Sequence, residues 1–257
     1  MKYKRELNFA RRIAAMAGRN AKRIRAMGTL VHDKPDGSPV TFADQQNDCL
    51  IRSAIECAYS GDGIVSEESP EKASLNGRRW IIDPLDGTED FVRGNRFWCV
   101  LIALEDEREL VIGVAHFPML GETYWAVRGV GSYLEGQRLH ASRTCSIEAS
   151  SFNANGLNIV ADRPYSKAVM ELIRKCRAVR AYGGALDACL VAAGKTEIWF
   201  ETNVEPWDLA ALKLILEESG ALFFAIDGTR DIDKGTAIGC APGVATDLRN
   251  MFGLDVL

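Results

Sequence analysis

The chain has 257 residues, of which 47% are hydrophobic and 26% are charged, as is usual for a globular protein. This length fits one large domain or two closely packed ones. A net charge of -4 at pH 7 gives no support to nucleic acid as the main partner. No apolar segment is long enough to span a membrane and no signal peptide is recognisable, so we expect a cytoplasmic protein.

Residues 1–27 are predicted to form an amphipathic helix. Leu7, Ala10, Ala14 and Ala17 recur at helical spacing and make an apolar stripe. The segment is also basic, and its cationic residues are Lys2, Lys4, Arg5, Arg11, Arg12, Arg19, Lys22, Arg23 and Arg25. The simplest interpretation is a solvated helix face, and binding to RNA or to a membrane surface is the alternative.

The cysteines and histidines give no sign of a disulfide framework or a zinc site. The seven cysteines are widely spaced and include no C-x-x-C pair, which indicates reduced, mostly buried thiols. The three histidines share no metal-ligand spacing.

A polar loop over residues 31–41 precedes a helix that we expect to open at Asp44 and to run to about Tyr59. Such a loop is often only a connector, but a mobile loop carrying Lys34 could also close over an anionic ligand. Residues 64–69 then resemble a short strand that ends in the paired acids Glu67 and Glu68.

The next strand ends abruptly in the turn Asp83-Pro84-Leu85-Asp86-Gly87-Thr88. Two carboxylates are delivered to this turn, Gly87 allows the chain to approach a ligand closely, and a helix is expected to start at Thr88. Carboxylate, carbonyl and hydroxyl oxygens suit a hard divalent cation, and a helix N-terminus offers N–H groups to a phosphate. The alternative is a capped strand-to-helix turn that binds nothing.

The pattern of elements changes near residues 142–155. Short, glycine-punctuated strands precede this segment and favour an antiparallel or mixed sheet; they are residues 79–82, 99–105, 110–117 and 123–127. After it, strands at 157–160, near 179 and at 196–200 alternate with helices at 166–176, 185–193 and 206–219. We therefore predict an N-terminal metal-binding α+β lobe, residues 1–145, and a C-terminal α/β lobe, residues 146–257, packed as one compact unit.

A further acid, Asp208, lies in the first turn of the last of these helices, which Pro206 opens. Alone, it would be ordinary helix-start chemistry. Together with Glu67, Asp83 and Asp86, it makes the set of acids that a metal site assembled from separate loops requires. Without a cation, converging carboxylates would repel each other by roughly 1 kcal/mol per pair even in water.

Three motifs resemble, in order and spacing, those of the inositol monophosphatase family of Mg²⁺-dependent, lithium-sensitive phosphatases. They are Ser66-Glu67-Glu68, Asp83-Pro84-Leu85-Asp86-Gly87-Thr88 and Pro206-Trp207-Asp208. The loop from Lys34 to Asp44 also resembles that family's K-x-D-x-S-P-V-T-x-A-D loop. The resemblance covers nearly the whole chain. It implies a layered αβαβα sandwich of the inositol monophosphatase and fructose-1,6-bisphosphatase type, a homodimer, and hydrolysis of a small phosphate monoester by water.

The resemblance also implies roles for single residues. Those implied to hold two or three Mg²⁺ ions per active site are Glu67, Asp83, the Leu85 carbonyl, the Thr88 hydroxyl, Asp86 and Asp208. Asp83 would be shared between two ions, and Glu67 would also reach a weaker third. Asp44 and Thr88 would activate the attacking water, and the amides of Gly87 and Thr88 would receive the phosphate.

The choice of phosphate ester is implied to depend on Glu201, with the Gly183–Gly184 turn beside it. The continuation to Leu186-Asp187 favours an inositol-phosphate-type substrate. Histidinol phosphate is the alternative that residues 91–104 and 120–124 favour, and a nucleotide 3′-phosphate is a third. A regulatory protein that binds RNA or a protein factor is the alternative of another class. The chain retains every expected metal ligand, which argues against this regulatory alternative.

Overall fold

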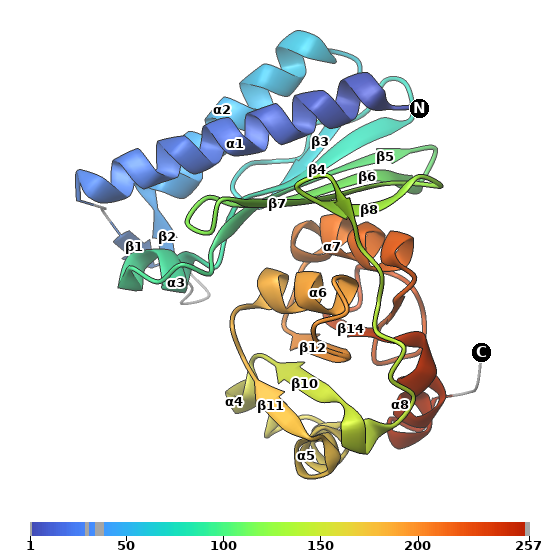
Figure 1. The fold of residues 1–257 in the computed structure, drawn as a ribbon. Coiled ribbons are helices and arrows are strands. Elements are labelled where there is room, and N and C mark those ends of the chain that lie inside the picture. Colours follow the sequence, from blue (N-terminus) through green and yellow to red (C-terminus); the bar gives the residue numbers. More distant parts are fainter. Residues whose placement is uncertain (1, 29–30, 34–38, 255–257) are drawn as a thin grey trace.

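The fold is a stack of five layers, in a computed structural model that describes residues 2–28, 31–33 and 39–254. The helices are α1 (Lys4–Ala26), α2 (Phe42–Ala58), α3 (Thr88–Arg93), α4 (Leu157–Val160), α5 (Ser166–Lys175), α6 (Gly184–Ala192), α7 (Pro206–Ser219) and α8 (Ala245–Met251), with 3-10 turns at Ile147–Ala149 and Pro242–Val244. Figure 1 shows α1 and α2 on one face of a large sheet, α6 and α7 between two sheets, and α4, α5 and α8 beyond the second sheet. This order of layers confirms the predicted αβαβα sandwich.

The larger sheet has seven strands in simple chain order. They are β3 (Gly63–Ser66), β4 (Arg78–Asp86), β5 (Cys99–Asp106), β6 (Glu109–Phe117), β7 (Glu122–Val127), β8 (Gly131–Leu134) and β9 (Gln137–Arg138). β3 and β4 run parallel, and each later pair is antiparallel. The sheet is therefore mixed, as the glycine-punctuated strands predicted.

The second sheet has five strands in the order β11-β10-β12-β14-β13. They are β10 (Ser151–Ala154), β11 (Ala178–Arg180), β12 (Ile198–Thr202), β13 (Leu222–Phe224) and β14 (Thr236–Cys240). β10 is parallel to both of its neighbours, whereas β14 is antiparallel to β12 and β13. A separate hairpin pairs β1 (Val31–Asp33) with β2 (Pro39–Thr41).

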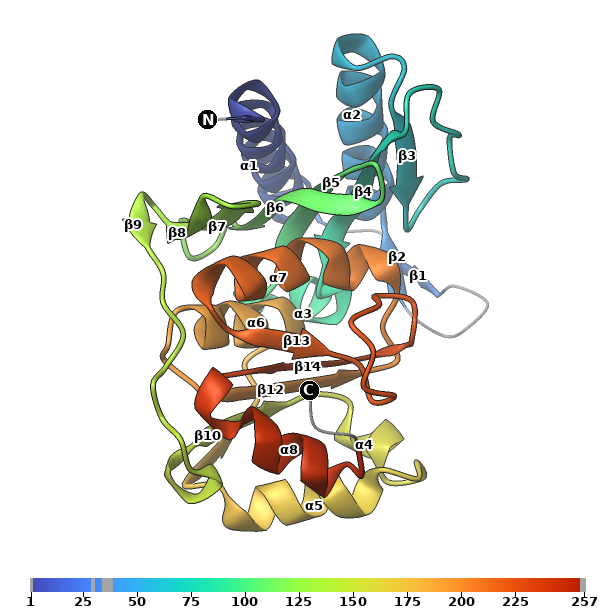
Figure 2. The ribbon, with the colours of Figure 1, turned by 90° about the vertical axis from the view of Figure 1, so that its right-hand side faces the viewer.

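Figure 2 shows the segment after β9 running down one side of the molecule to reach β10, so that residues 139–150 connect the two sheets. This connection overlaps the segment at which the sequence changes character. The division into lobes at residue 145 stays a prediction, because α6 and α7 follow that point in the chain but pack between both sheets.

The core is divided among the layers. Leu7, Ile13 and Ile51 pack with Trp80 and Ile102 between the α1–α2 layer and the larger sheet. The middle and far layers hold separate clusters, of which the first joins α6 and α7 to the larger sheet and the second joins α5 and α8 to the smaller one. α7 packs closely on β6, where the Cβ of a non-glycine residue at Gly113 would come within 2.5 Å of the Ala211 carbonyl oxygen. That glycine sets the distance between helix and sheet.

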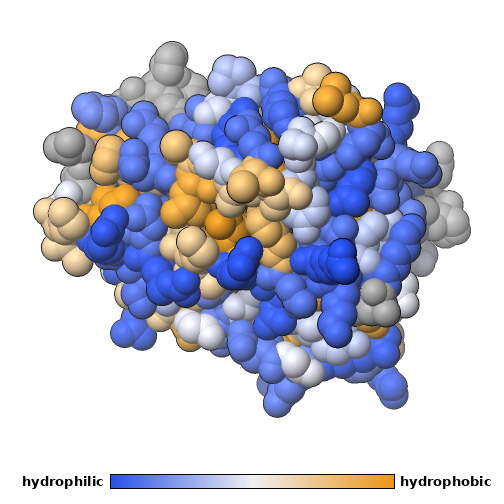
Figure 3. Space-filling view, turned by 90° about the horizontal axis from the view of Figure 1, so that it is seen from above, coloured by the Kyte–Doolittle hydropathy of each residue, from blue (hydrophilic) through white to orange (hydrophobic). Residues whose placement is uncertain are grey.

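The apolar stripe predicted for the first helix is confirmed. Leu7, Ala10, Ala14 and Ala17 are buried, and some basic side chains of α1 also have roles in packing. For example, the Arg25 guanidinium lies over the Phe91 and Trp98 rings and donates to the Asn95 carbonyl oxygen at 3.1 Å. From above, the helix layer shows a largely hydrophilic surface with an apolar area near its centre (Figure 3). Among the described residues, no helix is long and apolar enough to cross a membrane.

One predicted strand is wrong. Residues 157–160 form α4, and the strand of this region is β10, six residues earlier. A short apolar run does not distinguish a strand from a helical turn by its pattern. Gly156 decides the matter, because its positive φ of 65° ends the extended chain and begins α4.

The prediction of mostly buried cysteines is only partly right. All seven are free thiols, but three are buried, one is intermediate, and Cys49, Cys57 and Cys145 are exposed.

Candidate active site

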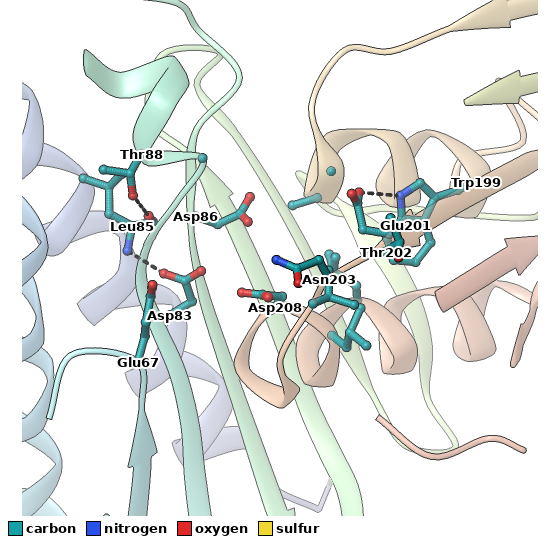
Figure 4. A pocket seen from close by; sticks show the side chains of 16 residues that line it. Glu67, Asp83, Leu85, Asp86, Thr88, Trp199, Glu201, Thr202, Asn203 and Asp208 are labelled. Carbon is teal, nitrogen blue, oxygen red and sulfur yellow. Dashed lines mark hydrogen bonds between the residues drawn. The ribbon is translucent and has the colours of Figure 1, made fainter. Parts of the chain in front are cut away.

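A cavity of about 230 Å³ opens between the two sheets, where the end of β4 and the start of α3 face α6, β12 and α7. Its walls include nine of the residues predicted from the sequence: Glu67, Asp83, Leu85, Asp86, Gly87, Thr88, Gly184, Glu201 and Asp208. Asp44 lies behind Thr88 and Gly183 adjoins Gly184 in the turn, while Lys34 lies outside the described residues. Residues from both halves of the chain therefore surround one cavity (Figure 4).

The turn after β4 is held by its own side chains. The Leu85 amide donates to Asp83 Oδ1 at 2.8 Å, which curls the chain back over the carboxylate. Gly87 follows with a φ of 81°, and a Cβ there would lie 3.3 Å from the Trp98 Cα, so both conformation and space call for glycine. This geometry presents Asp83, Asp86 and the start of α3 to the same cavity.

Three carboxylates converge across the cavity. Asp83, Asp86 and Asp208 each offer one oxygen, and these oxygens lie within 4.8 Å of one another. Asp208 is carried in from the opposite side by the first turn of α7, where its Oδ2 accepts from the Glu205 amide at 2.8 Å. Asp208 is thus both a helix-capping residue and a member of the acid cluster. Figure 4 shows Glu67 pointing into the same space.

The acids perturb one another strongly. Burial, and then the charge of Glu67, raise the pKa of Asp83 well above its usual value. Burial is also the main cause that raises the pKa of Asp86 to about 7. For Asp208, burial and the nearby Asp86 raise the pKa to about 8. Burial and the neighbouring carboxylates together disfavour the charged forms of these acids, and a positive charge placed among them would lower the pKa values again.

The donor set fits a hard divalent cation. Among the residues that the structure describes, those that line the cavity include five acids and no lysine, arginine or histidine. The offered atoms are carboxylate oxygens, with a backbone carbonyl and a hydroxyl nearby, which are the ligands that Mg²⁺ prefers. A bound cation would also relieve the mutual repulsion that raises these pKa values.

Asp44 and Thr88 form a hydrogen-bonded pair at the edge of the cavity. Thr88 Oγ1 donates to Asp44 Oδ1 at 3.1 Å and also lies 3.2 Å from the Leu85 carbonyl oxygen. The other Asp44 oxygen accepts from the amide and the hydroxyl of Thr41, at 2.8 Å and 2.5 Å, in a capping box that starts α2. Burial raises the pKa of Asp44 and makes it a better proton acceptor.

Glu201 occupies the other end of the cavity, on β12. Its Oε2 accepts from Asn155 Nδ2 at 3.1 Å and from Trp199 Nε1 at 3.3 Å. Within the part of the chain that the structure describes, Oε1 accepts no hydrogen bond from the protein. Burial raises the pKa of Glu201 well above its usual value, and the nearby Asp86 adds to this effect. Gly184 makes room for the carboxylate, since a Cβ there would lie 2.8 Å from Glu201 Oε2.

Asp187 shapes the Gly183–Gly184 turn from behind. It is fully buried and accepts from Asn153 Nδ2 at 2.6 Å, from Asn155 Nδ2 at 3.0 Å, and from the amides of Tyr182 and Gly183. Its carboxylate is therefore occupied with the protein's own groups. Asn155 connects it to Glu201, because its amide donates to both acids.

Several residues of the site were not foreseen from the sequence. Cys99 Sγ lies 3.5 Å from Asp86 Oδ2, and Asn155 and Trp199 hold Glu201. Among these only Trp199 carried a signal, since it lies two residues before Glu201 on the same strand and therefore on the same face. The asparagine contact spans 46 positions and has no fixed spacing.

Comparisons with known proteins agree with this geometry. Residues 3–251 match the inositol monophosphatase family. The chain is 36% identical over 234 residues to a histidinol-phosphatase of Chlorobaculum parvum, covering 91% of this chain and 90% of that protein. It is 30% identical over 243 residues to an inositol-1-monophosphatase of Mesorhizobium japonicum, covering 90% of each.

The fold is also found among solved structures. The extragenic suppressor protein suhB from Bartonella henselae superposes with a TM-score of 0.90 at 27% identity, covering 98% of this chain and all of that one. The match to the family extends over nearly the whole chain and includes all three acidic motifs. The chain therefore belongs to the inositol monophosphatase family.

Proposed function

We propose that this phosphatase hydrolyses histidinol phosphate. Members of the family are phosphatases and are in general Mg²⁺-dependent, so the chain is a hydrolase of a small phosphate monoester. The specific substrate is supported by the end of the cavity at which Glu201 lies and at which the alcohol portion of the substrate would bind. Glu201 is buried there, and the described residues that line the cavity include no basic residue. A substrate ammonium group would supply the missing positive charge.

The cation site is proposed on the acid cluster. Glu67, Asp83, the Leu85 carbonyl and the Thr88 hydroxyl would hold one Mg²⁺, and Asp83, Asp86 and Asp208 a second, with Glu67 reaching a third. Bound Mg²⁺ supplies a more acidic water and neutralises charge on the phosphate and the leaving oxygen. The amides of Gly87 and Thr88 would receive the phosphate.

Asp44 and Thr88 act together as the base. The attacking water gives a proton to Thr88 Oγ1, which passes its own proton to Asp44 Oδ1 along the 3.1 Å hydrogen bond. The Thr41 donors occupy the other Asp44 oxygen and so direct the transfer to Oδ1. The raised pKa of Asp44 favours this transfer near neutral pH. The water oxygen bonds to the phosphorus as the ester P–O bond breaks, and the released alkoxide takes up a proton from solvent water.

Inositol phosphate is the second candidate. The sequence favoured it because the Gly183–Gly184 turn continues to Leu186-Asp187. Asp187 is buried and accepts hydrogen bonds from protein groups. The Leu186-Asp187 sequence therefore reflects how the turn is stabilised and does not identify the alcohol portion of the substrate. The inositol-1-monophosphatase relative is also less similar, at 30% identity against 36%. An inositol hydroxyl could nevertheless donate a hydrogen bond to Glu201, so inositol phosphate is included among the substrates to be tested.

A substrate panel tests the proposal. We expect kcat/KM with Mg²⁺ to be highest for histidinol phosphate, above inositol 1-phosphate and adenosine 3′,5′-bisphosphate. Glu201→Gln should lower kcat/KM for histidinol phosphate about 10- to 100-fold, because a charged hydrogen bond to the ammonium is lost. The same variant should affect inositol 1-phosphate less, since an amide oxygen still accepts from a hydroxyl.

Glu171→Gln, the same change at an ion-paired residue on the surface of α5, is the control and should leave all three values unchanged. A preference for inositol 1-phosphate over histidinol phosphate in the parent protein would overturn the proposal. The homodimer that the resemblance implies stays a prediction, for which sedimentation velocity is the measurement.

A further inference from the structure

One face of α2 buries three polar side chains. Asp44, Asn47 and Asp48 are spaced three and four residues apart, so they share a face of the helix, and each is at most 3% exposed. The same helix buries Ile51 and Ile55 one and two turns later, as a core helix ordinarily does. Buried polar groups need partners, and here the partners are three different segments of the active site.

Asn47 holds the turn that carries the acids. Its Nδ2 donates to the Pro84 carbonyl oxygen at 3.1 Å, and its Oδ1 accepts from Asn20 Nδ2 of α1, also at 3.1 Å. The Asn20 contact fixes which end of the amide faces the turn. Asn47 is fully buried, so no water replaces it at the Pro84 carbonyl.

The peptide between Pro84 and Leu85 is consequently held at both ends. Its carbonyl accepts from Asn47, and its N–H donates to Asp83 Oδ1. Rotation of this peptide would release that Asp83 oxygen. Asn47 therefore helps to set the orientation of Asp83, which we assign to the cation site, and fixes the backbone that leads to the Leu85 carbonyl.

Asp48 does the same for the loop that carries Glu67. Its Oδ1 accepts from the Ser66 hydroxyl and its Oδ2 from the Ser69 hydroxyl. The two serines flank Glu67 and Glu68, so the carboxylate closes the loop at both sides of the acids. The clamp therefore depends on the hydroxyl groups of Ser66 and Ser69, which any residue without a hydroxyl would remove.

We propose that Asn47 and Asp48 are positioning residues for the cation site, through which α2 sets the affinity for Mg²⁺. Neither side chain is among the residues that line the cavity, so both act through the turn and the loop. Partners that orient metal ligands typically change metal affinity about 10- to 100-fold when removed. The inference rests on the cation site of the proposed function and is independent of which alcohol is released.

The test measures Mg²⁺ binding by titration calorimetry without substrate, beside the melting temperature in EDTA. We expect Asn47→Leu and Asp48→Ala to raise the Kd for Mg²⁺ about tenfold or more. Asp48→Asn should stay within about threefold of the parent, because the amide accepts from Ser66 and donates to the Ser69 hydroxyl. Ile51→Val, a core change on the same helix, should lower the melting temperature and leave Kd unchanged.

If Asn47→Leu does not fold, Asn20→Ala removes the hydrogen bond to Asn47 and Ser66→Ala the one to Asp48, and both carry the same expectation. Unchanged Kd values in all folded variants, with lowered melting temperatures, would show that α2 only stabilises the fold and would overturn the inference. A parent protein that binds no Mg²⁺ would overturn it together with the cation site. If the protein binds Mg²⁺ but does not hydrolyse histidinol phosphate, only the proposal about the substrate is contradicted.

Discussion

Asp83 is the most constrained acid of the cavity. One of its oxygens accepts from the Leu85 amide, and the residue is 2% exposed among three other carboxylates. Its raised pKa means that, without a cation, its charge opposes folding. Its burial among carboxylates therefore does not stabilise the ion-free protein, which fits the role in cation binding that we propose for it.

We expect Asp83→Asn to lower kcat/KM by about a hundredfold or more, because the variant loses a carboxylate shared between two ions. The free energy of unfolding in EDTA should be unchanged or higher, since a buried charge is removed. Asp162→Asn, an exposed acid, serves as the control. Activity above about a tenth of the parent value would contradict the placement of Asp83 between the ions.

The raised pKa values also predict how pH acts on stability. A carboxyl whose pKa is raised on folding binds more protons in the folded state, so its contribution is fully present below its unfolded value and is lost as pH rises through the folded one. For Asp86 and Asp208 this loss begins at the unfolded value, about 4, and is nearly complete at about 7 and about 8. In EDTA, the melting temperature should therefore fall from about pH 5 to about pH 8 and level off by about pH 9, and it should fall less in Asp208→Asn.

Mg²⁺ should reverse this trend, because it competes with the same protons. The increase in melting temperature that Mg²⁺ produces should be larger at about pH 9 than at about pH 6. Differential scanning fluorimetry across this range measures both effects. An increase that does not depend on pH would contradict a cation bound at Asp86 and Asp208.

At the scale of residues, the sequence predicted the acids and missed their supports. Glu67, Asp83, Asp86 and Asp208 were recognised because each ends a strand or starts a helix, where a carboxylate is conspicuous. Asn47 and Asn155 were missed, since an asparagine that bonds to a distant carbonyl or carboxylate has no spacing of its own. Such contacts exist only after the fold has brought the segments together.

At the scale of elements, the helices with strong end signals were predicted best. α7 begins at Pro206 and ends at Ser219 before Gly220, as the proline and glycine indicated. β10 was missed because it is short and both of its faces are buried, with Phe152 in the apolar core and Asn153 bonded to Asp187 on the other face. Four such residues show no clear alternation of apolar and polar side chains.

The contact of α7 with β6 gives a prediction for a single position. Gly113→Ala would place a methyl group 2.5 Å from the Ala211 carbonyl oxygen and 3.2 Å from the Ala211 Cα, so the helix must shift. We expect the free energy of unfolding to fall by about 1–3 kcal/mol. Urea denaturation measures it. In the control Gly61→Ala, the nearest atom is the end of the Asn76 side chain, at 3.3 Å, which can move.

A loss in Gly113→Ala no larger than in Gly61→Ala would show that this contact is looser than described. Because Asp208 begins the same helix, kcat/KM of Gly113→Ala should also fall, even though Gly113 does not line the cavity.

At the scale of the whole molecule, the layered architecture was predicted from the family resemblance more than from the pattern of strands and helices. Alternating strands and helices predicted an α/β layer in the second half, but gave no reason for α6 and α7 to pack against the sheet of the first half. That arrangement depends on the fit of Gly113 to Ala211 and on an ion-pair network. Within it, Glu217 of α7 accepts from Arg128, which follows β7, at 2.8 Å, and from Arg230 at 2.7 Å.

The position of Asp208 on α7 also has a consequence for how the protein is made. Glu67, Asp83 and Asp86 leave the ribosome early, whereas Asp208 comes only after the whole of β10 to β12. A nascent chain that has formed the first sheet therefore has an acid cluster without Asp208. At that stage α7, which covers this sheet in the complete fold, has not been synthesised. At the proposed cation site, Mg²⁺ would have its full set of ligands only once α7 is in place, so binding of the ion late in translation would favour the packing of α7 on the first sheet.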